Sequence, residues 1–100
     1  MIDVMPHVMA EVRRILAEHV PECEVRAFGS RVGGEAKPYS DLDLAVVGQE
    51  KIDRSRLARL KEAFEESNIP FRVDIVDWCS ISESFRGIIS ARCETIQNKK

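Results

Sequence analysis

Cysteine is scarce in this sequence, and a long run of apolar residues is absent. The three cysteines, Cys23, Cys79 and Cys93, are odd in number and widely spaced. That spacing excludes the common zinc-binding patterns and the disulfide framework of a small secreted domain. No apolar segment reaches the length of a membrane span, and no signal-peptide pattern opens the chain. We therefore expect a cytoplasmic protein with reduced thiols and no membrane partner.

An excess of charge of one sign is also absent. The formal net charge at pH 7 is −2, from 15 basic and 17 acidic residues. This balance argues against direct binding of nucleic acid through broad neutralisation of phosphates. Apolar residues make up 44% and charged residues 32% of the chain, as in folded globular proteins. With no repeat and no linker, the sequence predicts one small domain spanning residues 1–100.

Helical periodicity marks three segments. The first helix is expected to begin at Pro6 and to stop before Pro21. The second follows an N-cap at Asp53, and the third follows a capping box formed by Ser80 and Glu83. Between them, apolar runs predict three strands, at residues 24–28, 42–47 and 71–78. The order helix, strand, loop, strand, helix, strand, helix predicts an α+β fold.

Two acidic residues open the second predicted strand. Asp41 and Asp43 are two residues apart, so in an extended chain both carboxylates leave the same face. Two carboxylates this close raise each other's pKa unless a cation compensates them, and hard oxygen ligands suit magnesium. A turn residue at Asp41 and an ion pair of Asp43 with a nearby arginine would be alternative explanations.

A turn of small residues follows the first predicted strand. Gly29 has no side chain, so an anion can approach its backbone closely, and Ser30 adds a hydroxyl donor. Arg31 adds a fixed positive charge with forked donors. A polar loop that ends at Ser40 joins this turn to the acidic pair. A phosphate-binding turn beside a metal-binding acidic pair indicates a site for a nucleoside triphosphate.

The third predicted strand carries two further carboxylates on opposite faces. Asp74 interrupts an apolar run, and a carboxylate there is costly unless its charge is compensated. Asp77 is expected at the strand end, exposed to solvent. Trp78 and Phe85 could either pack in the core or serve an apolar interface such as that of a homodimer.

The motif Gly29-Ser30-Arg31-x-x-Gly34, followed by Ser40-Asp41-Leu42-Asp43-Leu44, resembles that of the minimal nucleotidyltransferases (MNT proteins) of the DNA polymerase β superfamily. The chain looks like an MNT antitoxin of the HEPN/MNT toxin–antitoxin modules, and Asp74 fits the third-carboxylate strand of that family. The resemblance implies the nucleotidyltransferase fold, a small mixed β-sheet flanked by helices. Family members often carry a basic residue where this chain has Gly33.

The resemblance also implies a mechanism. Asp41, Asp43 and Asp74 would be the catalytic residues and would hold two Mg²⁺ ions, with ATP as the nucleotide donor. Gly29 and Ser30 would hold the triphosphate, assisted by Arg31 or Ser40. The acceptor would be a hydroxyl group, expected to be a tyrosine, of a partner HEPN ribonuclease toxin that is silenced by the transfer of AMP. The alternative is a nucleotide-binding or inactive module that neutralises its HEPN partner by binding alone.

Overall fold

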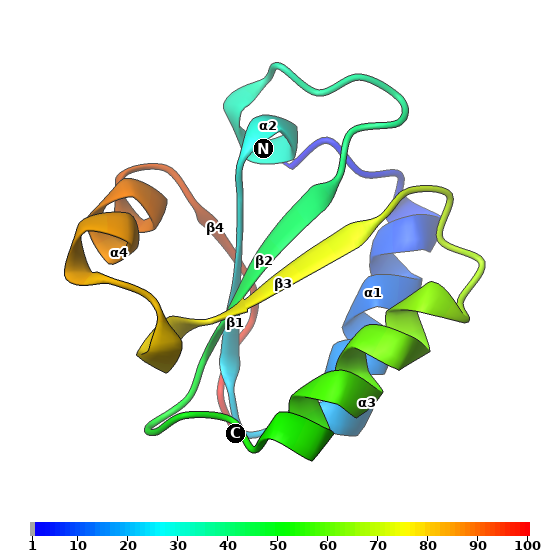
Figure 1. Ribbon diagram of the computed structural model, residues 1–100. Helices are drawn as coiled ribbons and strands as arrows, with labels where there is room; N and C mark the ends of the chain where they lie inside the picture. The colour runs from blue at the N-terminus through cyan, green and yellow to red at the C-terminus, as the bar shows by residue number, and fades with distance from the viewer. Residues whose placement is uncertain (1) are drawn as a thin grey trace.

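The computed structural model describes residues 2–100 and contains a four-stranded sheet with helices on both faces (Figure 1). The strands are β1 (Glu24–Phe28), β2 (Leu42–Val47), β3 (Val73–Asp77) and β4 (Glu94–Gln97). The α-helices are α1 (Pro6–His19), α2 (Ser30–Gly33), α3 (Arg54–Glu65) and α4 (Glu83–Ala91), and a 3-10 helix, η1 (Trp78–Ser80), follows β3. None of the helices within residues 2–100 combines the length and hydropathy required to cross a lipid bilayer.

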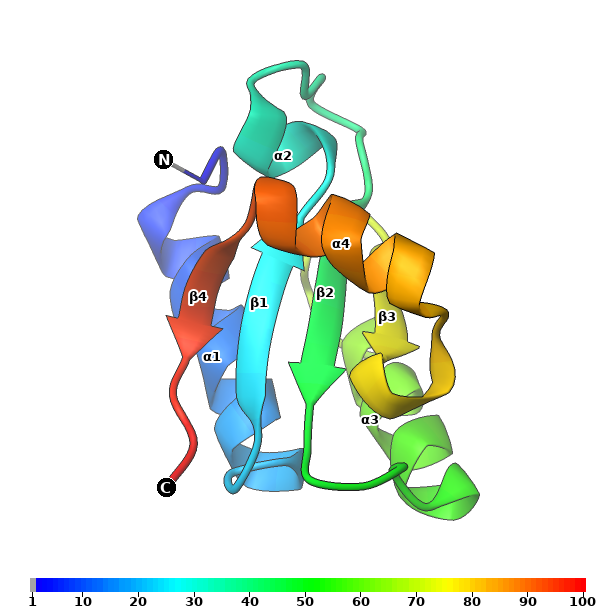
Figure 2. The same ribbon diagram turned by 90° about the vertical axis from the view of Figure 1, so that its left-hand side faces the viewer.

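The sheet is mixed, with strand order β3-β2-β1-β4. β1 runs antiparallel to both of its neighbours, β2 and β4, whereas β2 and β3 are parallel. Helices α1 and α3 cover one face of the sheet, and α4 crosses the other face (Figure 2). The predicted α+β fold with a small mixed sheet flanked by helices is confirmed.

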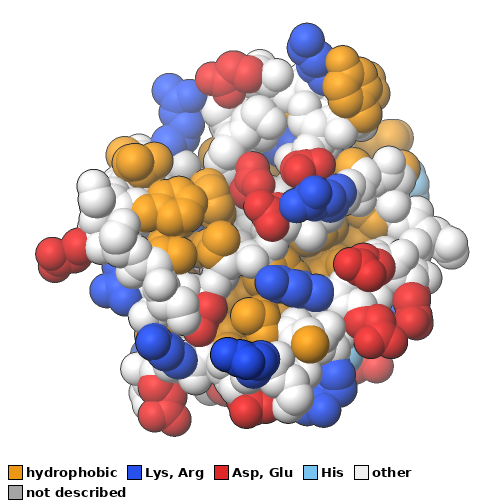
Figure 3. Space-filling view, viewed as in Figure 1, with side chains coloured by type: hydrophobic (Ala, Val, Ile, Leu, Met, Phe, Trp, Pro, Cys, Tyr) orange, Lys and Arg blue, Asp and Glu red, His pale blue; other side chains and the backbone are white. Residues whose placement is uncertain are grey.

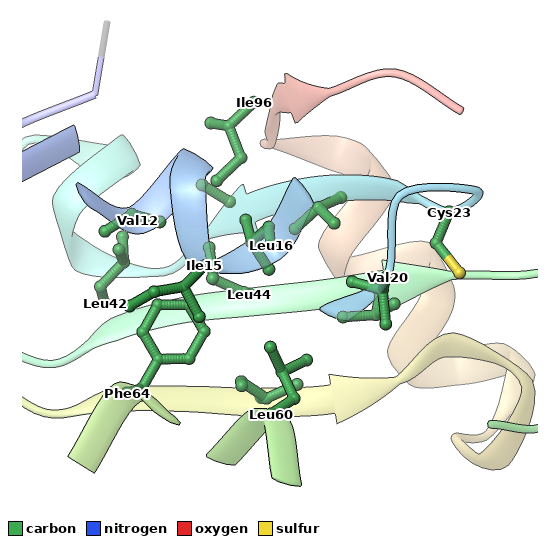
Figure 4. Close-up of a cluster of buried hydrophobic side chains, with 14 of the residues drawn as sticks. Val12, Ile15, Leu16, Val20, Cys23, Leu42, Leu44, Leu60, Phe64 and Ile96 are labelled. Carbon is green, nitrogen blue, oxygen red and sulfur yellow. The ribbon is translucent and has the colours of Figure 1, made fainter. Parts of the chain in front are cut away.

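The hydrophobic core lies between the sheet and the pair α1 and α3. Alternate residues of β2 point into this layer, including Leu42 and Leu44, which are fully buried. Leu16 of α1 and Leu60 of α3 meet them from the helical side (Figure 4). Because these residues occupy one face of β2, the intervening residue Asp43 must point to the opposite face.

The helix starts follow their predicted chemistry in two cases out of three. Pro6 opens α1, and the Asp53 side chain caps α3 by accepting a hydrogen bond from the Arg56 N–H. The predicted capping box of Ser80 and Glu83 is wrong. After β3 the chain forms η1, so α4 begins later than predicted. The Ser82 side chain caps α4 by accepting a hydrogen bond from the Phe85 N–H.

One strand was not expected from the sequence. β4 pairs with β1 along the edge away from β3, and Ile96 is its one buried residue. The Gln97 side chain anchors its end by donating to the carbonyls of Val20 and Cys23, at 2.9 and 3.0 Å. A four-residue strand with a single buried apolar side chain gives no periodic signal in the sequence.

Asp77 is not exposed, contrary to expectation. It ends β3 on the core side of the sheet with only 7% of its surface accessible. Its carboxylate accepts hydrogen bonds from the backbone N–H groups of Ile52 and Cys79 and from the Ser80 hydroxyl, at 2.9, 3.2 and 3.0 Å. Through these hydrogen bonds Asp77 holds both the segment before α3 and the residues of η1 at the end of β3.

The face under α4 carries aromatic side chains that are partly buried. The Phe85 ring packs edge-on against Phe28, with 5.9 Å between ring centroids. The Arg26 guanidinium lies 4.9 Å from the centroid of the Trp78 ring, and Arg86 lies 5.6 Å from it. Trp78 and Phe85 thus pack against this face of the sheet, and a homodimer through them stays a prediction.

Candidate active site

Strand pairing brings two of the three predicted carboxylates together. In the parallel ladder between β2 and β3, Asp43 is the direct neighbour of Asp74. Both side chains leave the face opposite to the core, since Leu42, Leu44 and Ile75 point into it. Asp41 lies one residue before β2, at the same end of the sheet. Figure 3 shows acidic side chains gathered here beside a basic one, where β2 begins in the view of Figure 1.

The environment of Asp43 opposes its ionisation. Burial raises the pKa of the Asp43 carboxyl to about 6 from its ordinary value of 3.8, and the negative charges of Asp74 and Asp41 add to this rise. The positive charge of Arg72 acts in the opposite direction. The negative charges of Asp74 and Asp41 therefore act on the Asp43 carboxyl, as expected for closely spaced carboxylates.

Arg72 is a member of this cluster that the motif did not point to. Its guanidinium lies 3.9 Å from an Asp41 oxygen and 3.8 Å from an Asp74 oxygen. The Arg72 side chain is 74% exposed, so these two ion pairs are weak and easily exchanged. The alternative explanation from the sequence was an ion pair of Asp43 with a nearby arginine. Arg72 instead pairs with Asp41 and Asp74.

The donor set fits a divalent cation in its chemistry. Within residues 2–100, no three His, Cys, Asp or Glu side chains are arranged so as to enclose a metal ion as they stand. The carboxylates of Asp43 and Asp74 nevertheless share one register position on adjacent strands, and their mutual repulsion is what a bound cation relieves. Closing Asp41 onto them requires side-chain rotation and the release of Arg72, both inexpensive at an exposed site.

The glycine–serine turn lies directly beside the carboxylates. Gly29 follows Phe28, the β1 residue paired with Asp43, and adopts φ 81° and ψ −160°, a conformation open essentially to glycine alone. A Cβ added to Gly29 would collide with the Asp43 carboxylate. The Gly29 carbonyl accepts from the N–H groups of Val32 and Gly33, which starts α2. The Gly29–Ser30 turn therefore lies next to the acidic pair, as the sequence predicted.

Arg31, predicted to assist in phosphate binding, has backbone partners in the structure. It is 5% exposed, and its guanidinium donates to backbone carbonyls, including those of Asp3 and Ser40. Ser40 also has a structural partner, since its hydroxyl oxygen accepts from the Lys37 N–H at 2.8 Å. Both residues hold the loop between α2 and β2. The Arg31 guanidinium bonds to these carbonyls because it is buried. A guanidinium that is shielded from water needs hydrogen-bond acceptors for its N–H groups, and the carbonyls of the adjoining loop provide them.

Residues 9–100 match the model of the nucleotidyltransferase domain family. The chain belongs to that family. This nucleotidyltransferase is 50% identical to the Probable protein adenylyltransferase MntA of Haemophilus influenzae, over 99% of this chain and 87% of the relative.

Solved structures share the fold of this nucleotidyltransferase. A crystal structure of a toxin–antitoxin complex with AMP-PNP matches it with a TM-score of 0.77 and 22% identity, over 92% of this chain and 74% of that one. A tri-AMPylated HEPN toxin of Shewanella oneidensis in complex with its MNT antitoxin contains a second match, with a TM-score of 0.69 and 19% identity over 93% and 71% of the two chains. These likenesses confirm the nucleotidyltransferase fold predicted from the sequence.

Proposed function

We propose that this nucleotidyltransferase is the antitoxin of a toxin–antitoxin pair and acts as a protein adenylyltransferase. It transfers AMP from Mg-ATP to a tyrosine hydroxyl of a partner HEPN ribonuclease toxin and thereby silences the toxin. Its 50% identity to a protein named as an adenylyltransferase supports the reaction class. A related fold in complex with an AMPylated HEPN toxin supports the partner. The observation that carries the proposal is the pairing of Asp43 with Asp74 beside Gly29.

The acidic cluster accounts for the use of a nucleoside triphosphate. Asp41, Asp43 and Asp74 would hold two magnesium ions, whose charge neutralises the triphosphate and the departing pyrophosphate. The Gly29 backbone and the Ser30 hydroxyl would bind the phosphates at the start of α2, where backbone N–H groups have no partner within the helix. Because burial and like charge raise the pKa of Asp43, its ionisation is coupled to the arrival of this positive charge.

The acceptor approaches from the edge of the sheet. β3 is an edge strand, and the Asp74 side chain on it is 49% exposed, so a group carried by another protein can reach it. The acceptor oxygen attacks the α-phosphorus, and the bond from that phosphorus to the oxygen leading to the β-phosphate breaks. The hydroxyl proton passes to Asp74, and pyrophosphate leaves. Most of the rate enhancement in such a reaction comes from positioning and charge neutralisation.

The position of the label in ATP tests the reaction. The protein is incubated with magnesium and its purified HEPN toxin, together with ATP labelled either at the α- or at the γ-phosphate. We expect label on the toxin from α-labelled ATP alone, because the γ-phosphate leaves with pyrophosphate. Label from γ-labelled ATP would indicate a kinase, and label from neither would overturn the proposal.

The Asp43→Asn variant distinguishes catalysis from simple occlusion of the toxin. This change removes a predicted metal ligand while keeping the size of the side chain. Catalytic silencing predicts that the variant still binds the toxin and no longer silences its ribonuclease activity. If silencing survives in Asp43→Asn at the same protein ratio, the protein acts by binding alone.

A further inference from the structure

Arg31 connects the loop that leads to Asp41 with the turn that carries Ser30. Its guanidinium donates to the carbonyls of Ser40 at 2.9 Å, Pro38 at 3.0 Å and Lys37 at 3.4 Å. Each of these carbonyls belongs to the loop between α2 and β2. The residue after Ser40 is Asp41, and the residue before Arg31 is Ser30. One side chain therefore fixes the distance between the predicted phosphate-binding turn and the first carboxylate.

The same side chain also holds two more distant segments. Arg31 donates to the Asp3 carbonyl at 2.8 Å, while the Asp3 N–H donates to the Arg31 carbonyl at 2.7 Å. The guanidinium carbon lies 3.9 Å from the centroid of the Phe71 ring, in the segment that leads into β3 and Asp74. The N-terminal segment, the turn, the loop and the approach to the third carboxylate thus meet at one buried cation.

Lysine could not reproduce this arrangement. An ammonium group is a compact charge on a flexible stem, whereas a guanidinium is planar, directs its donors along fixed lines and stacks on an aromatic ring. At 5% exposure, donors that lose their carbonyl partners find little water to replace them. The loop would keep its sequence and lose its fixed position.

We propose that Arg31 is a positioning residue for AMP transfer, one that sets the separation of Ser30 and Asp41 without contacting the nucleotide. The inference rests on the proposed function. Its consequence is specific: loosening the loop misplaces Asp41 relative to the bound triphosphate, and a misplacement of about 1 Å costs on the order of 100-fold in rate. Nucleotide affinity, which depends on contacts outside Arg31, changes far less.

The test compares Arg31→Lys with Arg56→Lys. Arg56 offers a matched control, because its guanidinium also donates to a backbone carbonyl, that of His19 at 3.1 Å, and pairs with both oxygens of Glu22. It lies at the start of α3, at the opposite end of the sheet from α2 (Figure 1). Both variants replace a planar guanidinium with an ammonium group. Only Arg31→Lys does so beside the acidic cluster.

For Arg31→Lys we expect kcat for AMP transfer to the HEPN toxin to fall by about 10-fold or more, with KM for Mg-ATP within about 3-fold of wild type. Hydrogen exchange in residues 35–41 becomes faster. Arg56→Lys keeps kcat within about 2-fold. The proposal is overturned if Arg31→Lys transfers AMP at the wild-type rate, or if both variants lose activity in proportion to their loss of thermal stability.

A second variant covers the case in which Arg31→Lys does not fold. Phe71→Leu removes the ring under the guanidinium and leaves its hydrogen-bond acceptors in place, and we expect the same kcat loss on a smaller scale. If wild-type protein transfers no AMP at all, the proposed function fails. Hydrogen exchange then tests only whether Arg31 holds the loop. Faster exchange at residues 35–41 in Arg31→Lys, and not in Arg56→Lys, supports that hold, but the role in AMP transfer falls with the proposed function.

Discussion

The carboxylate of Asp43 fills the space that a Cβ on Gly29 would occupy. This contact joins the end of β1 to β2, and it keeps the glycine–serine turn against the acidic cluster. The Gly29 backbone, at φ 81° and ψ −160°, is also in a region that other residues enter only at a cost of about 1–3 kcal/mol. Two independent constraints therefore require glycine at this position.

Gly29→Ala should abolish AMP transfer and lower the melting temperature. The backbone cost alone corresponds to a shift on the order of 5–20 °C in a domain of this size. Displacement of the Asp43 carboxylate removes activity at temperatures where the variant is still folded. The measurements are thermal unfolding by circular dichroism and labelled AMP transfer well below the midpoint.

Gly87→Ala is the matched control for this change. Gly87 is an exposed residue within α4, and a Cβ there meets no atom within 4 Å apart from its chain neighbours and the backbone of its own helix. Alanine favours a helix over glycine by about 0.5–1 kcal/mol, so the control should raise the melting temperature by a few degrees and keep full activity. A wild-type rate in Gly29→Ala would contradict the close contact with Asp43.

The stability of the folded protein should depend on pH through the ionisation of Asp43. Its pKa in the folded protein, about 6, lies above the ordinary value of 3.8 because of burial and then Asp74 and Asp41. The folded state binds this proton more tightly than the unfolded state. The stabilisation is present below pH 4 and is lost as the pH rises through 6. Asp43→Asn should lose this decline and melt at a higher temperature than wild type at pH 7.5, in the absence of divalent cations.

Magnesium should reverse that pH dependence. A bound cation favours ionised Asp43, so magnesium affinity should increase as the pH rises from 5 to 7 and binding should release a proton. Calorimetry in buffers of different ionisation enthalpy measures the proton release. Identical pH–stability curves for wild type and Asp43→Asn would show that Asp43 is not the coupled group.

Asp74 and Asp77 should respond in opposite ways to the same substitution. Asp74→Asn removes a half-exposed carboxylate with a weak ion pair, so stability should change by less than about 0.5 kcal/mol while AMP transfer is lost. Asp77→Asn disturbs a buried carboxylate that accepts from Ile52, Cys79 and Ser80, at a cost of about 1–3 kcal/mol.

Urea unfolding and the rate of AMP transfer, measured on both variants, separate the two roles. The Asp77→Asn variant that remains folded should retain a substantial part of the wild-type rate, since its carboxylate points to the core side of the sheet. Retained activity in Asp74→Asn would remove Asp74 from the catalytic group.

Nucleotide binding should be visible as a thermal shift. At a free Mg-ATP concentration a hundredfold above the dissociation constant, binding stabilises the folded state by about 2.7 kcal/mol. In a domain of this length that amounts to about 10–20 °C. The shift should disappear with a chelator and in Asp43→Asn, and a comparison with GTP, CTP and UTP reports base preference. No shift at millimolar Mg-ATP would count against a nucleotide site.

The parts of the fold that the sequence predicted are those with strong local signals. The bounds of β1 and β2 agree with the prediction, because each is an apolar run ended by glycine, at Gly29 and Gly48. The start of α3 agrees as well, since Asp53 is a favourable N-cap. Asp43 and Asp74 meet because a period of two placed each carboxylate on one face of its strand, and the parallel register aligned them.

The parts that the sequence did not predict depend on contacts between distant segments. The buried Asp77 carboxylate accepts a hydrogen bond from the N–H of Ile52, which is 25 residues away in the sequence. Arg31 was expected at the phosphates because it follows the glycine–serine turn. Its actual partners, Asp3 and the loop carbonyls, become visible only when the chain is folded. β4 is short, and its pairing with β1 rather than any pattern of its own makes it a strand.

The most direct test of the central claim is the mass of the HEPN toxin after coexpression with this protein. With wild type, the intact toxin should gain the mass of one or more AMP groups, located on tyrosine by tandem mass spectrometry, and its ribonuclease activity should be absent after the antitoxin is removed. With Asp43→Asn, the toxin should keep its unmodified mass and its activity. An unmodified toxin that is silent only while wild-type protein is bound would contradict the account.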